Sequence, residues 1–519
     1  MTISANRSQL IWTPLLGWAV LSMAASGALA QAPADSSTTG VPADVTVVPG
    51  GAVPPAGPSG LLPPYTNVPG TSGSSYGGTA PGTSTTAAPV TPSPTAEFNR
   101  LTPPPTQYSA TGLSIGGAPV GGTFSGPMVE GEELGATIGA FTLYPAIDVN
   151  VGYDSNVFAQ NPSQGPITGS LYTTIVPSLD LRSNWLRHSL RVLMGGGFGF
   201  YASAPTQNYQ NYNLLAEGGI DIQEDMRLTT SIGFRRATEA VGTPNTAIAS
   251  SPTVVDTVPI RLGLYQRFNR FYYDISGTAT RYFFQDNSVV SSSSLPAASR
   301  DRWEYSENFR FGYEITEDFA LYVAPNISQI RYIHPTNTVG QERDSNQMGF
   351  GVGGTWTISP TSAFDGNIGY TTKTYDTGSG FSSTSAWTGQ LSGNWNGYAP
   401  LTLQPSFSRS INESALSNYK NIVTTALALN FQYVIHDSWA MTGGLSYTAA
   451  DYTPISGAAS TSPPRTDTII RAQLGLMYSL RPQVAIGPMI EHTVGSSTDP
   501  VNGPFYTRDA IYIRLTAKR

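Results

Sequence analysis

The sequence has 519 residues, of which 12% are charged and 39% hydrophobic, and its formal net charge is -7. Soluble domains average about 25% charged residues, so this composition is not that of a protein surrounded by water on all sides. Cysteine is absent, which excludes disulfides and thiolate metal sites, and there is no basic block that would indicate nucleic-acid binding.

Residues 1–30 have the pattern of a secretory signal peptide. A basic residue, Arg7, precedes an apolar stretch over 11–25, and Ala28-Leu29-Ala30 forms a small-residue cleavage site. The alternative is a membrane anchor, but the stretch is short and ends in that cleavage motif. We therefore expect the chain to be exported from the cytoplasm.

Residues 31–138 are rich in Pro, Gly, Ser, Thr and Ala, as in the run Thr102-Pro103-Pro104-Pro105. Proline removes backbone donors and glycine raises the entropic cost of ordering, and the segment lacks the apolar residues that would offset this cost. We expect a disordered periplasmic tail. Binding of a periplasmic partner stays open as its role.

Apolar and polar side chains alternate in successive segments of residues 139–519. The pattern is clear in the first and last of these segments, where the apolar members are Ile147, Val149, Val151, Tyr153, Ile511, Ile513 and Leu515. The segments are about 10–14 residues long, above the mode of about 5–6 for soluble strands. Beyond the signal peptide no apolar run approaches the ~18 residues of a spanning helix. Together with export, this favours a transmembrane β-barrel over a soluble sandwich.

Short connections alternate with long ones along this region. The short ones are expected near 183–185, 223–225, 268–270, 316–318, 359–361, 396–397, 436–438 and 481–483, and the long ones include 154–169, 239–252, 285–299, 335–343, 453–464 and 495–505. Outer-membrane barrels keep short turns in the periplasm and long loops outside. The spacing predicts about 18 strands, and an even number places both termini in the periplasm.

The segment Leu143-Tyr144-Pro145-Ala146-Ile147 is followed by Gly152-Tyr153-Asp154-Ser155-Asn156-Val157-Phe158. These residues resemble the first strand and loop of the putative β-barrel porin 2 family of Gram-negative outer membranes, and the resemblance extends over about residues 140–519. It implies a porin-like barrel. Because some members of that family are associated with exopolysaccharide secretion, it also implies polysaccharide export as a specific role.

Strand alternation assigns a set of polar side chains to the lumen. The predicted lumen-lining residues are Asp148, Asn150, Arg191, Glu217, Asp221, Arg235, Arg261, Asp274, Arg310, Glu314, Arg471, Gln473 and Arg514. Both signs of charge are present, and opposed charges across a water-filled lumen favour small polar solutes. The alternative is that these groups merely solvate the lumen and pair with one another.

Inward tyrosines form a second candidate set. They are Tyr201, Tyr265, Tyr282, Tyr322 and Tyr332. Stacked aromatic rings suit sugars, which have apolar faces and polar rims, so these residues are candidates for saccharide stacking. Tyrosines near strand ends also serve as anchors at the membrane interface.

Two small groups of residues are candidates for chemistry. Asp154 and Asn156 could bind Ca²⁺ through side-chain oxygens, but such residues at a corner more often hydrogen-bond their own backbone, so we expect a turn and no metal site. His492 with Asp509 is the one candidate for hydrolysis. Ser496 is near His492 only in sequence, and no nucleophile motif accompanies the pair. We therefore expect no catalytic residues and no cofactor.

The sequence thus predicts an all-β protein, a transmembrane antiparallel β-barrel of about 18 strands with a disordered Pro/Gly/Ser-rich N-terminal tail. Its expected function is the passage of hydrophilic solutes through an outer-membrane pore, and the family resemblance adds exopolysaccharide export. The alternatives are a structural anchor for a periplasmic partner and a barrel hydrolase. Expected partners are outer-membrane lipid, small hydrophilic solutes or polysaccharide, and periplasmic export components, but no nucleic acid.

Overall fold

The computed structural model describes residues 135–519 except 164, 240, 246–251, 286–295, 337–339, 360, 377, 399 and 456–461. The predicted signal peptide, and the predicted tail as far as residue 134, therefore lie outside the described residues. The end of the segment assigned to the tail, Ala136–Ile138, forms a short strand, β1, because its backbone pairs with Phe141–Leu143 across a two-residue turn.

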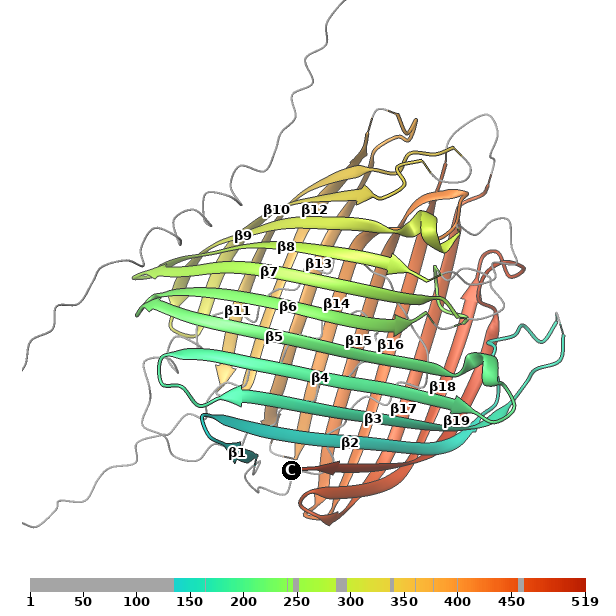
Figure 1. The fold of residues 1–519 in the computed structure, drawn as a ribbon, viewed down its shortest axis with the longest axis horizontal. Helices are drawn as coiled ribbons and strands as arrows, with labels where there is room; N and C mark the ends of the chain where they lie inside the picture. Colours follow the sequence, from blue (N-terminus) through green and yellow to red (C-terminus); the bar gives the residue numbers. More distant parts are fainter. Residues whose placement is uncertain are drawn as a thin grey trace, which may run out of the picture. The chain divides into compact units, whose positions relative to one another are not determined.

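The described residues form one antiparallel sheet (Figure 1). After β1, its strands are β2 (Phe141–Asp154), β3 (Ser170–Ser183), β4 (His188–Tyr201), β5 (Tyr209–Gln223), β6 (Met226–Thr238), β7 (Val254–Phe268), β8 (Phe271–Phe284), β9 (Arg302–Thr316), β10 (Phe319–Tyr332), β11 (Ser345–Ser359), β12 (Ser362–Tyr375), β13 (Thr384–Tyr398), β14 (Leu401–Glu413), β15 (Tyr419–His436), β16 (Trp439–Pro454), β17 (Arg465–Arg481), β18 (Val484–Ser497) and β19 (Tyr506–Lys518). Two short 3-10 helices, η1 (Pro205–Gln207) and η2 (Ala297–Arg300), lie in loops. No helix in the described ranges is long and apolar enough to cross a membrane.

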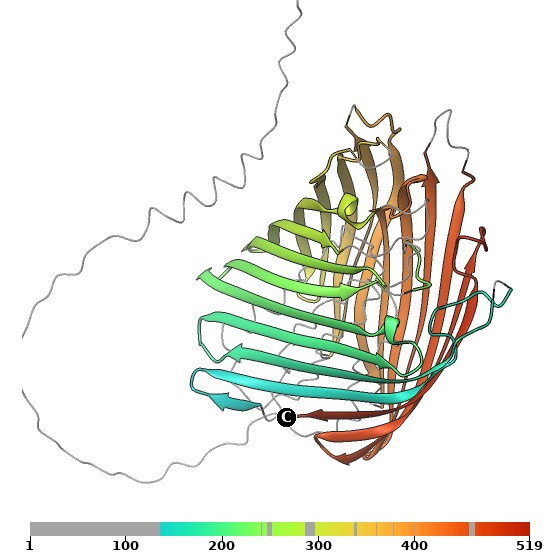
Figure 2. The same ribbon diagram turned by 45° about the vertical axis from the view of Figure 1, so that its right-hand side comes forward.

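The sheet closes on itself. Each strand from β2 to β18 pairs with the next, and β19 pairs back with β2 from Ala510↔Asp154 to Lys518↔Ala146. Figure 1 shows the C-terminus beside β1 and the start of β2, and Figure 2 shows the strands crossing the wall at a steep tilt. The predicted antiparallel barrel of about 18 strands is confirmed, with β2–β19 as the closed set.

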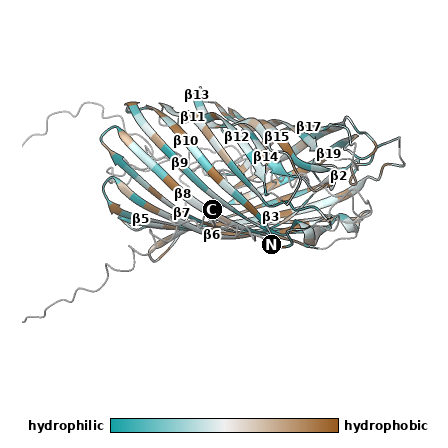
Figure 3. Cartoon of the chain, turned by 90° about the horizontal axis from the view of Figure 1, so that it is seen from above, coloured by the Kyte–Doolittle hydropathy of each residue, from teal (hydrophilic) through white to brown (hydrophobic). Residues whose placement is uncertain are grey.

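The alternation of the sequence decides which side of each strand faces outward. On β19, Ile511, Ile513 and Leu515 are 64%, 49% and 39% exposed, whereas Tyr512 and Arg514 are 2% and 0% exposed. Figure 3 shows the resulting apolar and polar bands along the strands. The apolar face points away from the lumen, as in a barrel surrounded by lipid.

Aromatic side chains gather near both ends of the outer face. Phe271 packs on Tyr313 at 4.8 Å between ring centroids near the short-turn end, and Trp303 stacks on Tyr305 at 5.8 Å near the long-loop end. Such belts are typical of the two membrane–water interfaces.

The connections differ between the two ends of the barrel. Turns of two to four residues join β3 to β4, β5 to β6 and so on at one end, and loops of five or more residues lie at the other. The start of β2 and the end of β19 lie at the short-turn end. The turn expected at 396–397 lies later in the chain, because β13 continues through Tyr398 and β14 begins at Leu401.

Candidate functional site

The inner face of the barrel carries the residues that alternation assigns to the lumen. All of them lie on the side of their strand opposite the exposed apolar residues: Asp148, Asn150, Arg191, Glu217, Asp221, Arg235, Arg261, Asp274, Arg310, Glu314, Arg471, Gln473 and Arg514. Their part in selecting solutes remains a prediction.

One group of inner-wall charges lies near the short-turn end, on β3–β5. Asp180 accepts hydrogen bonds from Arg182 at 2.7 Å and from Arg191 at 2.8 Å. Arg191 also lies 3.9 Å from Glu217, its register partner on β5. The structure thus brings together two predicted residues, Arg191 and Glu217, around Asp180, which the sequence reasoning missed.

A second group joins β9, β10 and β12. Arg310 donates to both carboxylate oxygens of Asp365, at 2.9 and 3.2 Å. The guanidinium lies over the Tyr322 ring, 3.8 Å from its centroid, and the Tyr322 hydroxyl also contacts Asp365 at 3.2 Å. Asp274 is the register partner of Arg310 on β8. These contacts fix the guanidinium against the wall.

The other predicted lumen residues are spread around the wall. Asp148 accepts from Thr516, and Asn150 contacts Thr174 and Arg514, so these two residues and Arg514 stabilise the β2–β19 junction. The remaining ion pairs are Asp221–Arg227 at 3.6 Å, Glu314–Arg267 at 4.0 Å and Arg471–Glu491 at 3.3 Å. Most of the lining charges therefore have a partner of opposite sign, as expected if these groups only solvate the lumen and pair with one another.

The five inward tyrosines are each less than 9% exposed. Tyr201 packs on Tyr172 and Tyr265 on Tyr272, at 5.8 and 5.9 Å between ring centroids. Arginines lie over two other rings, Arg302 over Tyr282 at 4.6 Å and Arg310 over Tyr322. Neighbouring groups cover these rings in this conformation, and saccharide stacking on them remains a prediction.

β14 separates from β13 at the long-loop end of the wall, while β15 stays paired with β16 up to Tyr419↔Pro454. The pairing of β13 with β14 stops at Gly389↔Arg409, although β13 begins at Thr384 and β14 continues to Glu413. From residue 411 to residue 424 every side chain except Asn418 is buried, so both faces of the hairpin end are covered. We call residues 411–424 the hairpin tip.

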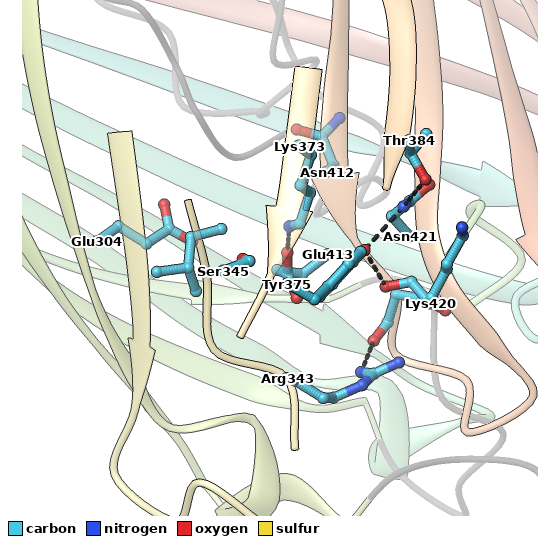
Figure 4. Close-up of polar contacts among 12 residues, drawn as sticks. Glu304, Arg343, Ser345, Lys373, Tyr375, Thr384, Asn412, Glu413, Lys420 and Asn421 are labelled. Atoms are coloured by element: carbon cyan, nitrogen blue, oxygen red, sulfur yellow. Dashed lines mark hydrogen bonds and ion pairs between the residues drawn. The ribbon is translucent and has the colours of Figure 1, made fainter. Parts of the chain in front are cut away.

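The hairpin tip contacts side chains of β10, β12 and β13, and Figure 4 shows Glu413 and Asn421 of the tip among Lys373, Tyr375 and Thr384. The Glu413 carboxylate forms an ion pair with Lys373 of β12 and accepts the Tyr332 hydroxyl of β10 at 2.5 Å. Asn421 donates to the Tyr375 hydroxyl and to the Thr384 hydroxyl, each at 2.8 Å. Lys373 and Tyr332 are on the inner faces of their strands, so the tip narrows the mouth of the lumen.

The β10–β11 loop holds the tip from a second side. Arg343 donates to the carbonyls of Ser414 and Tyr419, at 2.9 and 2.6 Å, and so bridges the two arms of the hairpin. The carboxylate of the next residue, Asp344, accepts the backbone N–H of Tyr332 at 2.8 Å. Burial raises the pKa of the Asp344 carboxyl above its ordinary value.

The β6–β7 loop reaches the tip from a distant part of the wall. The Asn245 amide donates to the Glu413 carbonyl at 2.8 Å and accepts the Ala415 N–H at 2.6 Å, and the Asn245 N–H donates to the Tyr452 hydroxyl. Gly242 of the same loop has a φ of +82°, and a β-carbon there would collide with Ala159 and Tyr506. The loop therefore passes across the long-loop mouth between β2–β3, β14–β15 and β19.

An apolar cluster narrows another sector of the lumen. Val157 of the β2–β3 loop packs with Tyr172, Met477, Met489 and Tyr512, all buried on inner faces. The inner surface is therefore charged on β3–β12 and partly apolar around the β2–β19 junction.

The corner after β2 forms the expected turn. The Asp154 carboxylate accepts the backbone N–H of Asn156 at 3.0 Å, and the same carboxylate is paired with Arg508 of β19. The Asn156 side chain is hydrogen-bonded to the backbone of Gln160. These oxygens are thus used by the turn and the ion pair. In the described ranges no group of three or more Asp, Glu or His residues has metal-binding spacing.

His492 and Asp509 meet on the outer face, with Nδ1 2.6 Å from the carboxylate. Both side chains are more than half exposed. Ser496 lies four residues along β18, roughly 13 Å away at about 3.3 Å per residue, and Ser497 points inward to Asp467 at 2.6 Å. Within the described ranges no serine hydroxyl is hydrogen-bonded to His492, so the pair has no nucleophile in contact with it.

Alternation alone could have found several residues that the sequence reasoning missed. Arg302 and Glu304 have the same parity on β9 as Arg310, and Asp365 has the same parity on β12 as Lys373. Asn245 and Arg343 lie in loops, where no periodicity assigns a direction. Their position at the mouth follows only from the three-dimensional structure.

A model of the family described as putative beta-barrel porin 2 matches residues 130–519. Solved structures similar to this chain include the unliganded ferric citrate transporter FecA, with 8% identity, coverage of 72% of this chain and 78% of that chain, and a TM-score of 0.39. They also include Acinetobacter baumannii OccAB3, with 9% identity, coverage of 73% of this chain and 99% of that chain, and a TM-score of 0.38. Pseudomonas aeruginosa OccK3 has 10% identity, coverage of 73% of this chain and 95% of that chain, and a TM-score of 0.36. No curated protein matches the chain.

Proposed function

The chain belongs to the putative beta-barrel porin 2 family and is a porin-like outer-membrane β-barrel, and from this premise we propose that it lets small hydrophilic solutes cross the outer membrane. The path is the polar lumen, with the hairpin tip at its long-loop mouth. Transport is diffusion without chemistry. Both termini lie on the periplasmic side.

The inner surface is the observation that carries this proposal. Charged and polar residues of many strands share the inner face, while the outer face of the same strands is apolar. Barrels of 16–18 strands leave an aqueous channel when loops do not fill it. The tip contacts the wall through polar groups such as Glu413 and Asn421, which suits a constriction bordered by water.

Orientation follows from the loops. Outer-membrane barrels keep short turns in the periplasm and long loops outside. The start of β2 and the end of β19 lie at the short-turn end, which supports periplasmic termini. Cysteine accessibility tests this: Cys at the exposed Asn502 in the β18–β19 loop should react in whole cells with a membrane-impermeant reagent. Cys at Glu224 in the β5–β6 turn should react only after the outer membrane is permeabilised.

Single-channel conductance of the refolded barrel in a planar bilayer tests the pore. We expect a steady open conductance. Insertion without conductance would contradict the proposal and favour the alternative of a structural anchor. A cellular defect caused by deleting residues 31–134 alone would then support the anchor.

Polysaccharide export is the finer role that the family resemblance implies, and it rests on that resemblance alone. Adding neutral oligosaccharides to the bilayer tests it. Reversible block by sugars, weakened by Tyr201→Ala or Tyr265→Ala, would support a saccharide path. A conductance indifferent to sugars would favour small solutes only.

A further inference from the structure

Arg343 is a buried cation without a carboxylate partner. The side chain is 1% exposed, its two terminal nitrogens donate to the carbonyls of Ser414 and Tyr419, and its Nε has no acceptor. No ion pair joins it to a carboxylate within 4.0 Å in the part of the chain with described positions. A guanidinium stays charged in proteins, and buried charges are normally paired.

Other buried polar groups without a hydrogen-bond partner lie on β9 and β11, near the loop that carries Arg343. Ser345 Oγ and Gln347 Nε2 are on the inner face of β11, and the two residues are 0% and 9% exposed. Arg302 of β9 has an Nη2 atom without a partner and is 1% exposed. Buried donors of this kind are rare in native structures, and several in one place call for an acceptor.

The strand register brings these groups onto one patch of the inner wall. Gln347 is the register partner of Lys373 on β12, and Ser345 is the register partner of Ile330 on β10. Tyr332, two residues beyond Ile330, is paired with Arg302 on β9. The hairpin tip borders the patch, where Arg343 and Lys373 contact it.

The charges of the patch do not cancel. Lys373 is paired with Glu413, and Arg302 with Glu304 at 2.8 Å. Arg343 remains as the cation without a counter-charge, since the carboxylate of Asp344 is engaged by the Tyr332 backbone. The patch therefore lacks one negative charge.

We infer that this patch is a binding site for the oxyanion group of a passing solute, a carboxylate or a phosphate, with Arg343 as its anchor. Ser345, Gln347 and Arg302 supply further donors. Guanidinium groups bind such anions through charge-assisted hydrogen bonds, which are about twice as strong as neutral ones. The inference rests on the proposed function, because it names the class of solute that the pore prefers.

Block of the single-channel current measures this site. Inorganic phosphate and succinate are added separately at constant ionic strength, with glucose as the neutral control. We expect saturable block by at least one anion and none by glucose. The anion with the lower half-blocking concentration identifies the preferred group, phosphate or carboxylate.

Substitutions link the block to the patch. Arg343→Gln should raise the half-blocking concentration at least about tenfold, as expected for a lost charge-assisted hydrogen bond. Gln347→Leu, which removes the unpartnered Nε2 donor together with the amide oxygen, should raise it by a smaller factor. Arg236→Gln is the matched control, because Arg236 pairs with Asp256 on the outer face of the barrel, and it should leave the block unchanged.

Equal block of the wild type and of folded Arg343→Gln would overturn the inference, as would equal block by glucose and the anions. Heat-modifiable migration on a gel verifies folding. If Arg343→Gln does not fold, the Gln347→Leu result decides. If the wild type inserts without conducting, the proposed pore function is contradicted, but the binding site can still be tested by thermal melting of the refolded barrel. Phosphate should then raise the melting temperature of the wild type more than that of Gln347→Leu.

Discussion

Asn245 and Ala415 are joined by a hydrogen bond of 2.6 Å from the Ala415 N–H to the Asn245 side-chain oxygen. The strands between them by the shorter way around the wall are β8–β13, so the bond connects two distant sectors of the barrel. The nitrogen of the same amide binds the Glu413 carbonyl. One side chain thus ties a loop to both sides of the bend where β14 ends.

Asn245→Gly should loosen this connection and widen the mouth. Glycine accepts the positive φ of 65° at this position, so the change removes the amide without adding backbone strain. Loss of hydrogen bonds worth about 1–3 kcal/mol should increase the mean single-channel conductance and its fluctuations. Asn269→Gly, at a φ of 57° in the β7–β8 turn, is the control. Identical current traces for the two variants would show that the Asn245 hydrogen bonds do not restrict the mouth.

Glu413→Gln should destabilise the barrel, because it leaves the Lys373 ammonium buried without its counter-charge. Breaking a buried pair in this way costs about 3–5 kcal/mol. Unfolding in urea, followed for the refolded protein, measures the loss. The double variant Lys373→Met/Glu413→Gln should recover most of it. Asp256→Asn, which breaks the outer Arg236 pair, should cost only about 0–1 kcal/mol.

Arg310→Gln should make the pore more selective for cations. The substitution removes the positive charge that neutralises Asp365 on the inner wall, and the carboxylate then faces the lumen unpaired. The reversal potential in a salt gradient reports the change, and Asp365→Asn should move it in the opposite direction. A reversal potential that neither variant moves would place this pair away from the ion path.

Ile513→Arg tests the outer face. Ile513 is half exposed on β19, and an arginine on the lipid face near the bilayer midplane costs about 2–4 kcal/mol. Thr507→Arg, on the same face near the long loops, should cost about 0–1 kcal/mol, because it lies close to the interface. Folding into lipid vesicles across a urea series compares the two. Equal costs would mean that the apolar band is not centred on Ile513.

The strands could be predicted from the sequence because each residue on them has only two directions to face. Ile511, Ile513 and Leu515 alternate with Tyr512 and Arg514, and this period of two is the one that a half-buried strand requires. The strand count followed in the same way, since every second connection is short. The turn after β13 was placed too early because Asn396 and Gly397 are frequent turn residues, yet both lie within the strand.

The constriction could not be predicted in the same way. Residues 411–424 carry mostly polar side chains, as a loop between two strands does, and nothing in their sequence shows that β14 separates from β13 after Arg409. The bend depends on partners that are distant in sequence, Tyr332, Lys373 and Asn245. The orientation of the Arg343 side chain likewise depends on distant residues, because it donates to the carbonyls of Ser414 and Tyr419.

The junction of β2 with β19 has a consequence for how the chain folds. Every other strand pair within β2–β19 joins neighbours in the sequence, which can form as hairpins while the rest of the chain is still unstructured. The junction alone needs the first and last strands together, and its Arg508–Asp154 pair and Asn150–Arg514 contact form only then. Until the thirteen residues of β19 are in place, β2 and β18 present unpaired edges, which are templates for aggregation. A nascent chain that stops before Tyr506 should therefore depend on periplasmic chaperones for its solubility, whereas the complete chain becomes independent of them on closure.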